Sequence, residues 1–71
     1  NPPQLEITQE NGVLSFRIRN ALQNFVLPLY WIAEDGKRMR IDASANLQTL
    51  STKGESIKPD STSSYFELIT K

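Results

Sequence analysis

Residues 5–19 read LEITQENGVLSFRIR, and this stretch decides the fold class. Apolar residues alternate with polar ones on both sides of Asn11-Gly12, which is the pattern of strands with one buried face. Asn-Gly between two such runs is the strongest short signal for a hairpin, because both residues accept the positive φ angles of a tight turn. The sequence therefore predicts a hairpin centred on Asn11-Gly12.

A second hairpin is predicted over residues 25–41. Its first strand, residues 25–33, is rich in β-branched and aromatic residues and is apolar on both faces, which indicates a central strand. Asp35-Gly36 supplies the turn, and the return strand alternates apolar and charged residues. Because proline cannot donate a hydrogen bond to a neighbouring strand, Pro28 predicts a local break in the pairing.

Three shorter strands complete the prediction, at residues 47–50, 57–59 and 65–70. Residues 42–50 are also the one helix candidate, because their alanines have helical propensity, although the apolar positions do not form a helical stripe. Six or seven short strands separated by turns predict a small all-β fold, an antiparallel β-sandwich that forms a single domain over residues 1–71. A five-stranded β-barrel is the alternative.

The composition limits how the chain is stabilised and what it binds. The 71 residues include no cysteine and no histidine, and eight Lys and Arg balance eight Asp and Glu. A chain this short buries only about 60% of its unfolded surface, so it depends on packing, on an oligomer or on a longer polypeptide. The zero net charge argues against a nucleic-acid partner. The longest apolar run, residues 25–33, is too short for a membrane span.

The residue types available also argue against catalysis. Without histidine and cysteine, Ser-His-Asp triads, cysteine nucleophiles and imidazole metal ligands are excluded. A carboxylate pair would need a deep cleft that raises the pKa of one partner, and a thin two-layer domain offers little depth. Glu34 and Asp35 are better explained by turn chemistry. The sequence therefore predicts no catalytic residue, no metal, no cofactor and no enzyme.

Three aromatic residues are candidates for a binding surface: Tyr30, Trp31 and Tyr65. Adjacent residues on a strand point to opposite faces, and Trp31 shares its face with Leu29. The pattern thus favours a core position for Trp31 and an exposed one for Tyr30, unless a bulge at Pro28 changes the phase. Tyr65 would lie beside Tyr30 only if the last strand neighbours the second hairpin.

Four arginines form a second candidate surface. Arg17 and Arg19 share one strand face, and Arg38 and Arg40 share another. If both strands belonged to one sheet, these side chains with Lys37 would form a basic patch for an acidic partner or a nucleic-acid backbone. The alternative is that they lie on solvated strand faces and pair with acidic side chains across the strands, which the zero net charge favours.

Several features recur in order between residues 18 and 69. They are Arg19-Asn20, the run Val26-Leu27-Pro28-Leu29-Tyr30-Trp31, the turn Asp35-Gly36, and Gly54 followed by Ile57 and Phe66-Glu67-Leu68. This order resembles the family of the von Hippel-Lindau β domain. The resemblance implies a β-sandwich that binds a protein or peptide. It does not extend to hydroxyproline recognition, because the family's pocket uses a histidine and a tryptophan, and Phe66 stands near the tryptophan position.

These observations favour a non-catalytic accessory module that binds a protein or peptide partner. A carbohydrate-binding module of an exported protein is an alternative, with Tyr30, Trp31 or Tyr65 as stacking platforms. A small nucleic-acid-binding β-barrel that uses the basic residues is a further alternative. The sequence does not indicate a cellular compartment.

Overall fold

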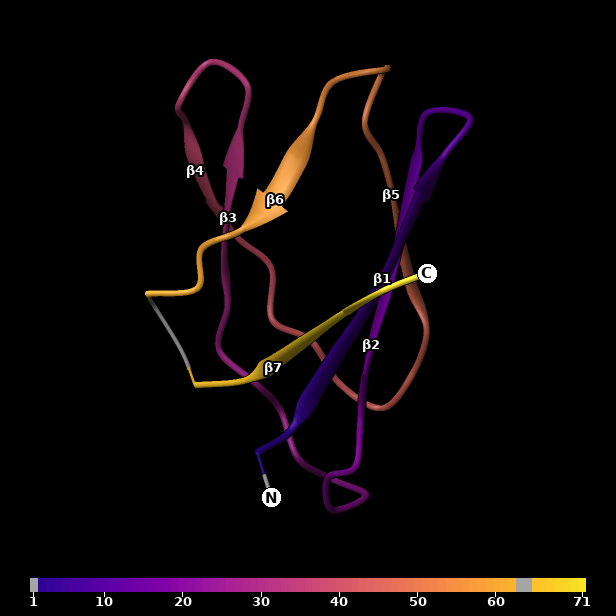
Figure 1. Ribbon diagram of the computed structural model, residues 1–71, viewed down its shortest axis with the longest axis vertical. Helices are drawn as coiled ribbons and strands as arrows, with labels where there is room; N and C mark the ends of the chain where they lie inside the picture. Colours follow the sequence, from indigo (N-terminus) through magenta and orange to yellow (C-terminus); the bar gives the residue numbers. More distant parts are fainter. Residues whose placement is uncertain (1, 63–64) are drawn as a thin grey trace.

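The computed structural model describes residues 2–62 and 65–71, and these form seven strands in two sheets (Figure 1). The strands are β1 (Gln4–Glu10), β2 (Val13–Arg19), β3 (Tyr30–Ala33), β4 (Arg38–Arg40), β5 (Gln48–Ser51), β6 (Ile57–Pro59) and β7 (Glu67–Thr70). One sheet has the order β5-β2-β1-β7 and the other the order β4-β3-β6. The prediction of a small all-β sandwich is confirmed. Residues 42–50 contain no helix, and β5 begins within them.

The first hairpin has the predicted turn. Glu10 pairs with Val13, so Asn11 and Gly12 alone form the loop between β1 and β2. Their φ angles are 53° and 75°. Two consecutive positive φ angles match the right-handed twist of the flanking strands, which explains why Asn-Gly suits this position.

The second hairpin is formed by β3 and β4, and β3 is central in its sheet as predicted. The Asp35 carboxylate accepts a hydrogen bond from the Lys37 N–H at 3.0 Å and so fixes the turn. β3 begins only at Tyr30, and Pro28 separates it from an isolated bridge between Leu27 and Ala43. The predicted interruption of the strand at Pro28 is confirmed.

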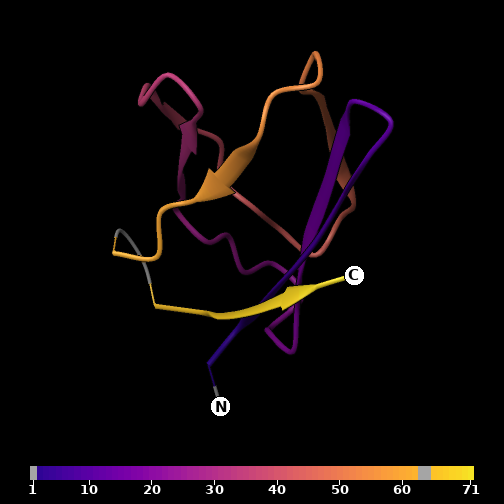
Figure 2. The ribbon, with the colours of Figure 1, turned by 45° about the horizontal axis from the view of Figure 1, so that its top comes forward.

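The final strand differs from the prediction of a fully antiparallel sandwich, because β7 runs parallel to β1. The chain passes from β6 in one sheet to β7 in the other, as Figures 1 and 2 show. A strand that arrives from the opposite sheet is not constrained by a hairpin turn, so either direction is open to it. β7 also begins at Glu67 rather than at residue 65.

The core lies between the two sheets. Its buried apolar residues are Leu5, Leu14, Phe16, Ile18, Leu27, Leu29, Trp31, Ala43 and Ile57. The four-stranded sheet contributes Phe16 and the three-stranded sheet contributes Trp31, which are the two largest fully buried side chains. The Trp31 Nε1–H donates to the Ile41 carbonyl oxygen at 2.9 Å, so the indole buries no unpaired donor.

Residues 41–44, which follow β4, close one side of the sandwich. Ala43 exchanges backbone hydrogen bonds with Leu27 at 2.8 and 3.0 Å, and the Ser44 carbonyl accepts from the Ile18 N–H at 2.7 Å. Leu27 precedes β3 in the smaller sheet, and Ile18 belongs to β2 in the larger sheet. This segment, which we term the crossing segment (residues 41–44), therefore bonds to both layers.

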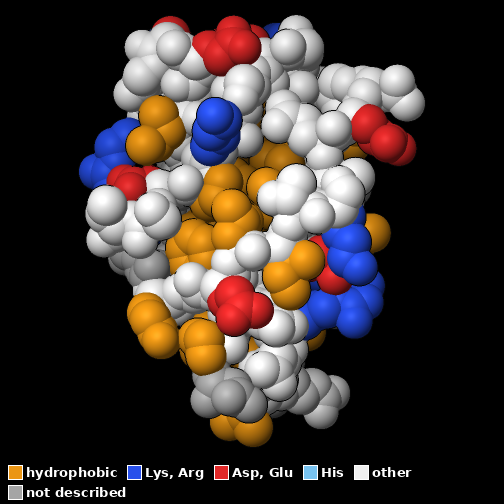
Figure 3. Space-filling model, viewed as in Figure 1, with side chains coloured by type: hydrophobic (Ala, Val, Ile, Leu, Met, Phe, Trp, Pro, Cys, Tyr) orange, Lys and Arg blue, Asp and Glu red, His pale blue; other side chains and the backbone are white. Residues whose placement is uncertain are grey.

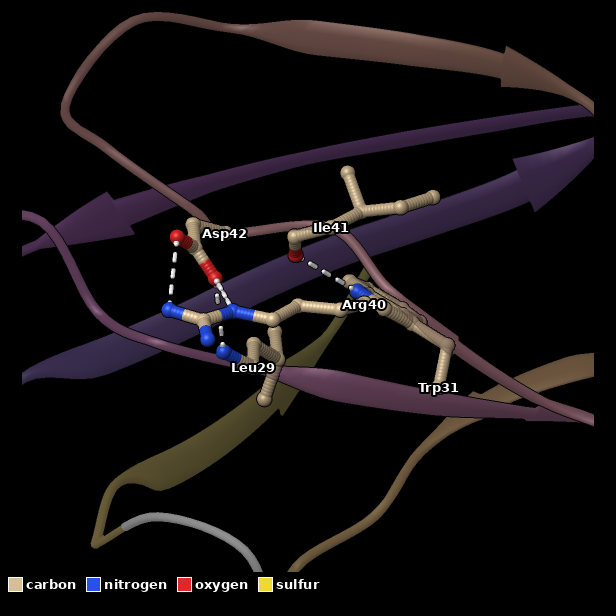
Figure 4. A network of polar contacts seen from close by, with 5 residues as sticks. All are labelled: Leu29, Trp31, Arg40, Ile41 and Asp42. Carbon is tan, nitrogen blue, oxygen red and sulfur yellow. Dashed lines mark hydrogen bonds and ion pairs between the residues drawn. The ribbon is translucent and has the colours of Figure 1, made fainter.

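Asp42 anchors the crossing segment (Figure 4). Its carboxylate accepts hydrogen bonds from the Arg40 guanidinium at 3.0 and 3.3 Å and from the Leu29 N–H at 3.2 Å. The hydrogen bond from Arg40, followed by that from Leu29, lowers the pKa of Asp42 below its ordinary value. The ionised carboxylate thus holds the segment at the end of β4.

Candidate binding groove

The structure separates the three aromatic candidates. Trp31 has no exposed surface, so it is a core residue and cannot serve as a ligand platform. Tyr30 is half-buried, and the Arg38 guanidinium carbon lies 4.3 Å from its ring centroid. Tyr65 is 78% exposed, but it precedes β7, which pairs with β1 in the other sheet. The condition for placing Tyr65 beside Tyr30 is therefore not met, and the three rings form no common platform.

Arg17 and Arg19 lie on β2, away from the sheet that contains Arg38 and Arg40. Both pair across the strands with Glu6, since their Nε atoms lie 3.4 and 2.6 Å from its carboxylate oxygens. Both contacts are ion pairs, and the buried Arg17 Nε has no hydrogen-bond partner among the described residues. The four arginines thus do not form a basic patch on a single sheet.

The other two arginines also have acidic neighbours. Arg38 lies 3.2 Å from Asp60, and Arg40 lies 3.0 Å from Asp42. Hydrogen bonds from Thr62, with a smaller contribution from Arg38, lower the pKa of Asp60. Each arginine candidate therefore shares its charge with a carboxylate, as the solvated-face interpretation expects.

A largely apolar groove lies between β6 and β7, with a volume of about 530 Å³. Figure 3 shows exposed hydrophobic side chains in the middle of this face. Residues of β1, β6 and β7 and of the segments next to them line the groove: Ile7, Gln9, Ser56, Ile57, Lys58, Pro59, Ser61, Phe66, Leu68, Thr70 and Lys71. Its size lies within the range of ligand and peptide pockets. None of the predicted binding residues lines it.

Leu68 shows that this side of the sandwich is uncovered. It is the register partner of Leu5 on the neighbouring strand, so both side chains point toward the interior. Leu5 has no exposed surface, whereas Leu68 is 49% exposed. An inward-facing leucine is exposed to this extent only where the opposite layer does not cover it.

The two sides of the sandwich are closed differently. The crossing segment bonds to both sheets on the side of β4 and β5. β6 and β7 are edge strands of different sheets, and no strand pairing joins them within the described residues. The groove thus lies where no backbone pairing of described residues joins the two layers, and the Gln9 side-chain amide, which donates to the Glu55 carbonyl at 2.8 Å, links them beside it.

The charges around the groove have one sign. Lys58 and Lys71 are its charged lining residues, and neither has a carboxylate partner within the described part of the chain. Apart from them the lining offers apolar, hydroxyl and amide groups. In residues 2–62 and 65–71, no three metal-ligating side chains gather, and no helix is long and apolar enough to cross a bilayer.

The fold and the groove define the class of molecule: a small all-β sandwich with an apolar groove between the edge strands of its two sheets. No protein-family model matches the chain, and no curated protein or solved structure matches it. The resemblance to the von Hippel-Lindau β domain therefore stays a prediction.

Sequence reasoning missed the groove, although it identified the residues around it. The alternation in residues 65–70 places Phe66 and Leu68 on the inner face of a strand. An inner face is normally covered, and only the strand order reveals that this one is not. A short C-terminal strand with two large apolar inward residues was the available signal.

Proposed function

We propose that this chain is a non-catalytic module that binds a segment of a protein or peptide in the groove between β6 and β7. The observation that carries the proposal is the exposure of Leu68, an inward-facing core-type residue that is 49% exposed. Apolar surface of this kind is stabilised when a partner covers it. The lining, with its lysines and hydroxyls, supports binding and offers no carboxylate pair for acid-base catalysis.

The shape of the groove favours an elongated occupant. Its lining runs along two strand edges, from Ser56 to Pro59 on one side and from Phe66 to Lys71 on the other. A chain segment fits between two strand edges and can place alternate side chains on an apolar floor. We therefore favour a peptide over a sugar or a nucleic acid.

Selection of peptides from a phage-displayed random library against the folded chain tests the proposal. Enriched peptides should bind the wild-type chain and lose at least about tenfold in affinity for Leu68→Asp, which places a charge in the groove. Leu47→Asp is the matched control, because Leu47 is 62% exposed and lies outside the groove lining. Equal binding to both variants, or no enrichment at all, would refute the proposal.

A further inference from the structure

We infer that the bound segment adds as a new edge strand on β7 and that it carries a carboxylate beside its apolar residues. This inference rests on the proposed function and specifies the mode of binding and the chemistry of the partner. It follows from the backbone groups that the edge strands present and from the charges beside them.

β7 presents backbone groups suited to strand addition. The N–H groups of Glu67 and Lys71 donate to carbonyls on the β1 side at 2.9 Å. Because backbone groups alternate in direction along a strand, those of Phe66, Leu68 and Thr70 point away from β1, at the open edge of the sheet beside the groove. None of these residues is a proline, and β7 is an edge strand of the described sheet.

β6, on the opposite bank of the groove, is a poorer template. The Asp60 N–H donates to the Tyr30 carbonyl. By the alternation along the strand, the backbone N–H and C=O of Lys58 also point toward β3, and the backbone groups of Ile57 and Pro59 point away from it. Proline has no N–H, so this outer edge offers a single donor within the strand. A segment in the groove would therefore pair with β7 and only contact β6 through side chains.

The other two edges lack one of these features. β4 carries two exposed charged residues, Arg38 and Arg40, whereas β7 carries one, Glu67, and charged side chains on an edge discourage pairing with another strand. β5 directs the backbone of Thr49 outward but does not border the groove. β7 alone among the described edges combines outward backbone groups with an adjoining apolar floor.

Lys58 and Lys71 determine the charge of the partner. Both lie on the groove lining without a carboxylate partner among the described residues, and no acidic residue shares that lining. A strand with apolar residues facing Ile57 and Leu68, and with a carboxylate near Lys58, satisfies the apolar floor and the charge together. An acidic flank also accelerates encounter with this face.

The probe is a synthetic peptide of alternating valine and threonine, flanked by aspartates and labelled with a fluorophore. Two variants are methylated on the backbone nitrogens of one or the other alternate set of residues. In strand addition only one set faces β7, so methylation of that set should weaken binding at least about tenfold, while methylation of the other set leaves it unchanged. Equal effects of the two methylations would overturn strand addition.

The contribution of the β7 backbone is tested by proline substitutions at two threonines, one on the edge strand β7 and one on the edge strand β5. Thr70→Pro removes an outward N–H of β7, whereas Thr49→Pro removes an outward N–H of β5. Peptide binding should be lost in the first and retained in the second, with circular dichroism showing that each variant is folded. If Thr70→Pro does not fold, the paired methylations decide the question without it.

The charge of the partner is tested by reversing charges on the peptide and on the protein, separately and together. Replacing the flanking aspartates by lysines should weaken binding to the wild-type chain roughly two- to fivefold at low salt, and Lys58→Glu should reverse the preference. An absence of coupling between the two changes would overturn the acidic partner.

The outcomes separate the inference from the proposed function. Peptides that lose affinity for Leu68→Asp but do not respond to methylation show groove binding without strand addition. Absence of peptide binding, together with concentration-dependent sedimentation that Thr70→Pro abolishes, would identify a second copy of this chain as the occupant. That result would overturn the inference of an acidic peptide.

Discussion

The rings of Phe16 and Trp31 contact each other across the two sheets, with their centroids 4.8 Å apart and their planes inclined by 53°. This tilted arrangement is favourable for aromatic pairs and links β2 to β3 at the centre of the core. The contact thus joins the two layers through their two largest fully buried side chains.

Replacing Trp31 by phenylalanine should lower the free energy of unfolding by about 2–3 kcal/mol. The variant keeps an aromatic ring near Phe16 but leaves a cavity and removes the donor to the Ile41 carbonyl. Urea unfolding followed by circular dichroism measures the change. Tyr65→Leu is the control, and it should shift stability by less than about 0.5 kcal/mol because Tyr65 is 78% exposed. Equal losses would contradict the central role of Trp31.

Leu5 and Leu68 should respond differently to the same truncation, although they are register partners. Leu5→Ala removes a fully buried side chain and should cost about 3 kcal/mol. Leu68→Ala should cost about 1 kcal/mol or less, since half of that side chain already contacts water. Chemical denaturation of both variants is the measurement, and similar losses would show that the groove is covered in solution.

Replacing Lys53 by a residue that tolerates a positive φ angle should stabilise the fold, because the φ angle of 53° at this position suits few side chains. It lies in the turn in which the Glu55 N–H donates to the Thr52 carbonyl. Lys53→Asn should raise the free energy of unfolding by about 0.5–1 kcal/mol, because asparagine enters this left-handed region more readily. Lys53→Ala has the same charge change and should give no such gain, so a gain from alanine would contradict the backbone explanation.

Asp42 should make stability depend on pH in the acid range. Its pKa is lowered in the folded state, so its stabilising effect is complete above the ordinary value of 3.8. That effect is lost as the pH falls through the lowered folded-state pKa, because protonation weakens the bonds from Arg40 and Leu29. Wild-type stability should exceed that of Asp42→Asn at about pH 7, and the difference should shrink as the pH falls below about 4.

The control for this pH dependence is Asp35→Asn, since Asp35 is a turn carboxylate that accepts one backbone hydrogen bond from Lys37. Urea unfolding of the wild-type chain and of both variants across the acid range is the measurement. A difference for Asp42→Asn that stayed constant through the acid range would contradict the electrostatic account.

Local patterns in the sequence were sufficient for most of the fold. Alternation around Asn11-Gly12 and the Asp35-Gly36 turn each specify a structure between neighbouring residues, so both hairpins were predictable. The alternation of faces along the strand correctly placed Trp31 in the core, on the same face as Leu29. Turn chemistry and strand alternation each depend on only a few neighbouring residues, so they can be recognised in the sequence.

The pairing of strands distant in the sequence was not predictable in the same way. The parallel pairing of β7 with β1 depends on how all the connections pass between the layers, and no short motif encodes it. The same holds for the groove, which exists because β6 and β7 end up on unconnected edges. The arginine patch was conditional on both arginine-bearing strands lying in one sheet, and the zero net charge favoured solvated strand faces instead; the arginines are split between two sheets, and Arg17 and Arg19 pair with Glu6.

The pairing of β1 with β7 also bears on how the chain reaches its folded state. Gln4 and Glu67 are register partners, and 63 positions separate them in the sequence. Contacts this remote slow folding, because the chain loses much of its entropy before the contact forms. During synthesis β1 can pair with β2 early, but its other edge stays open until β7 leaves the ribosome. This open edge of β1 is thus a site for aggregation until β7 has been synthesised.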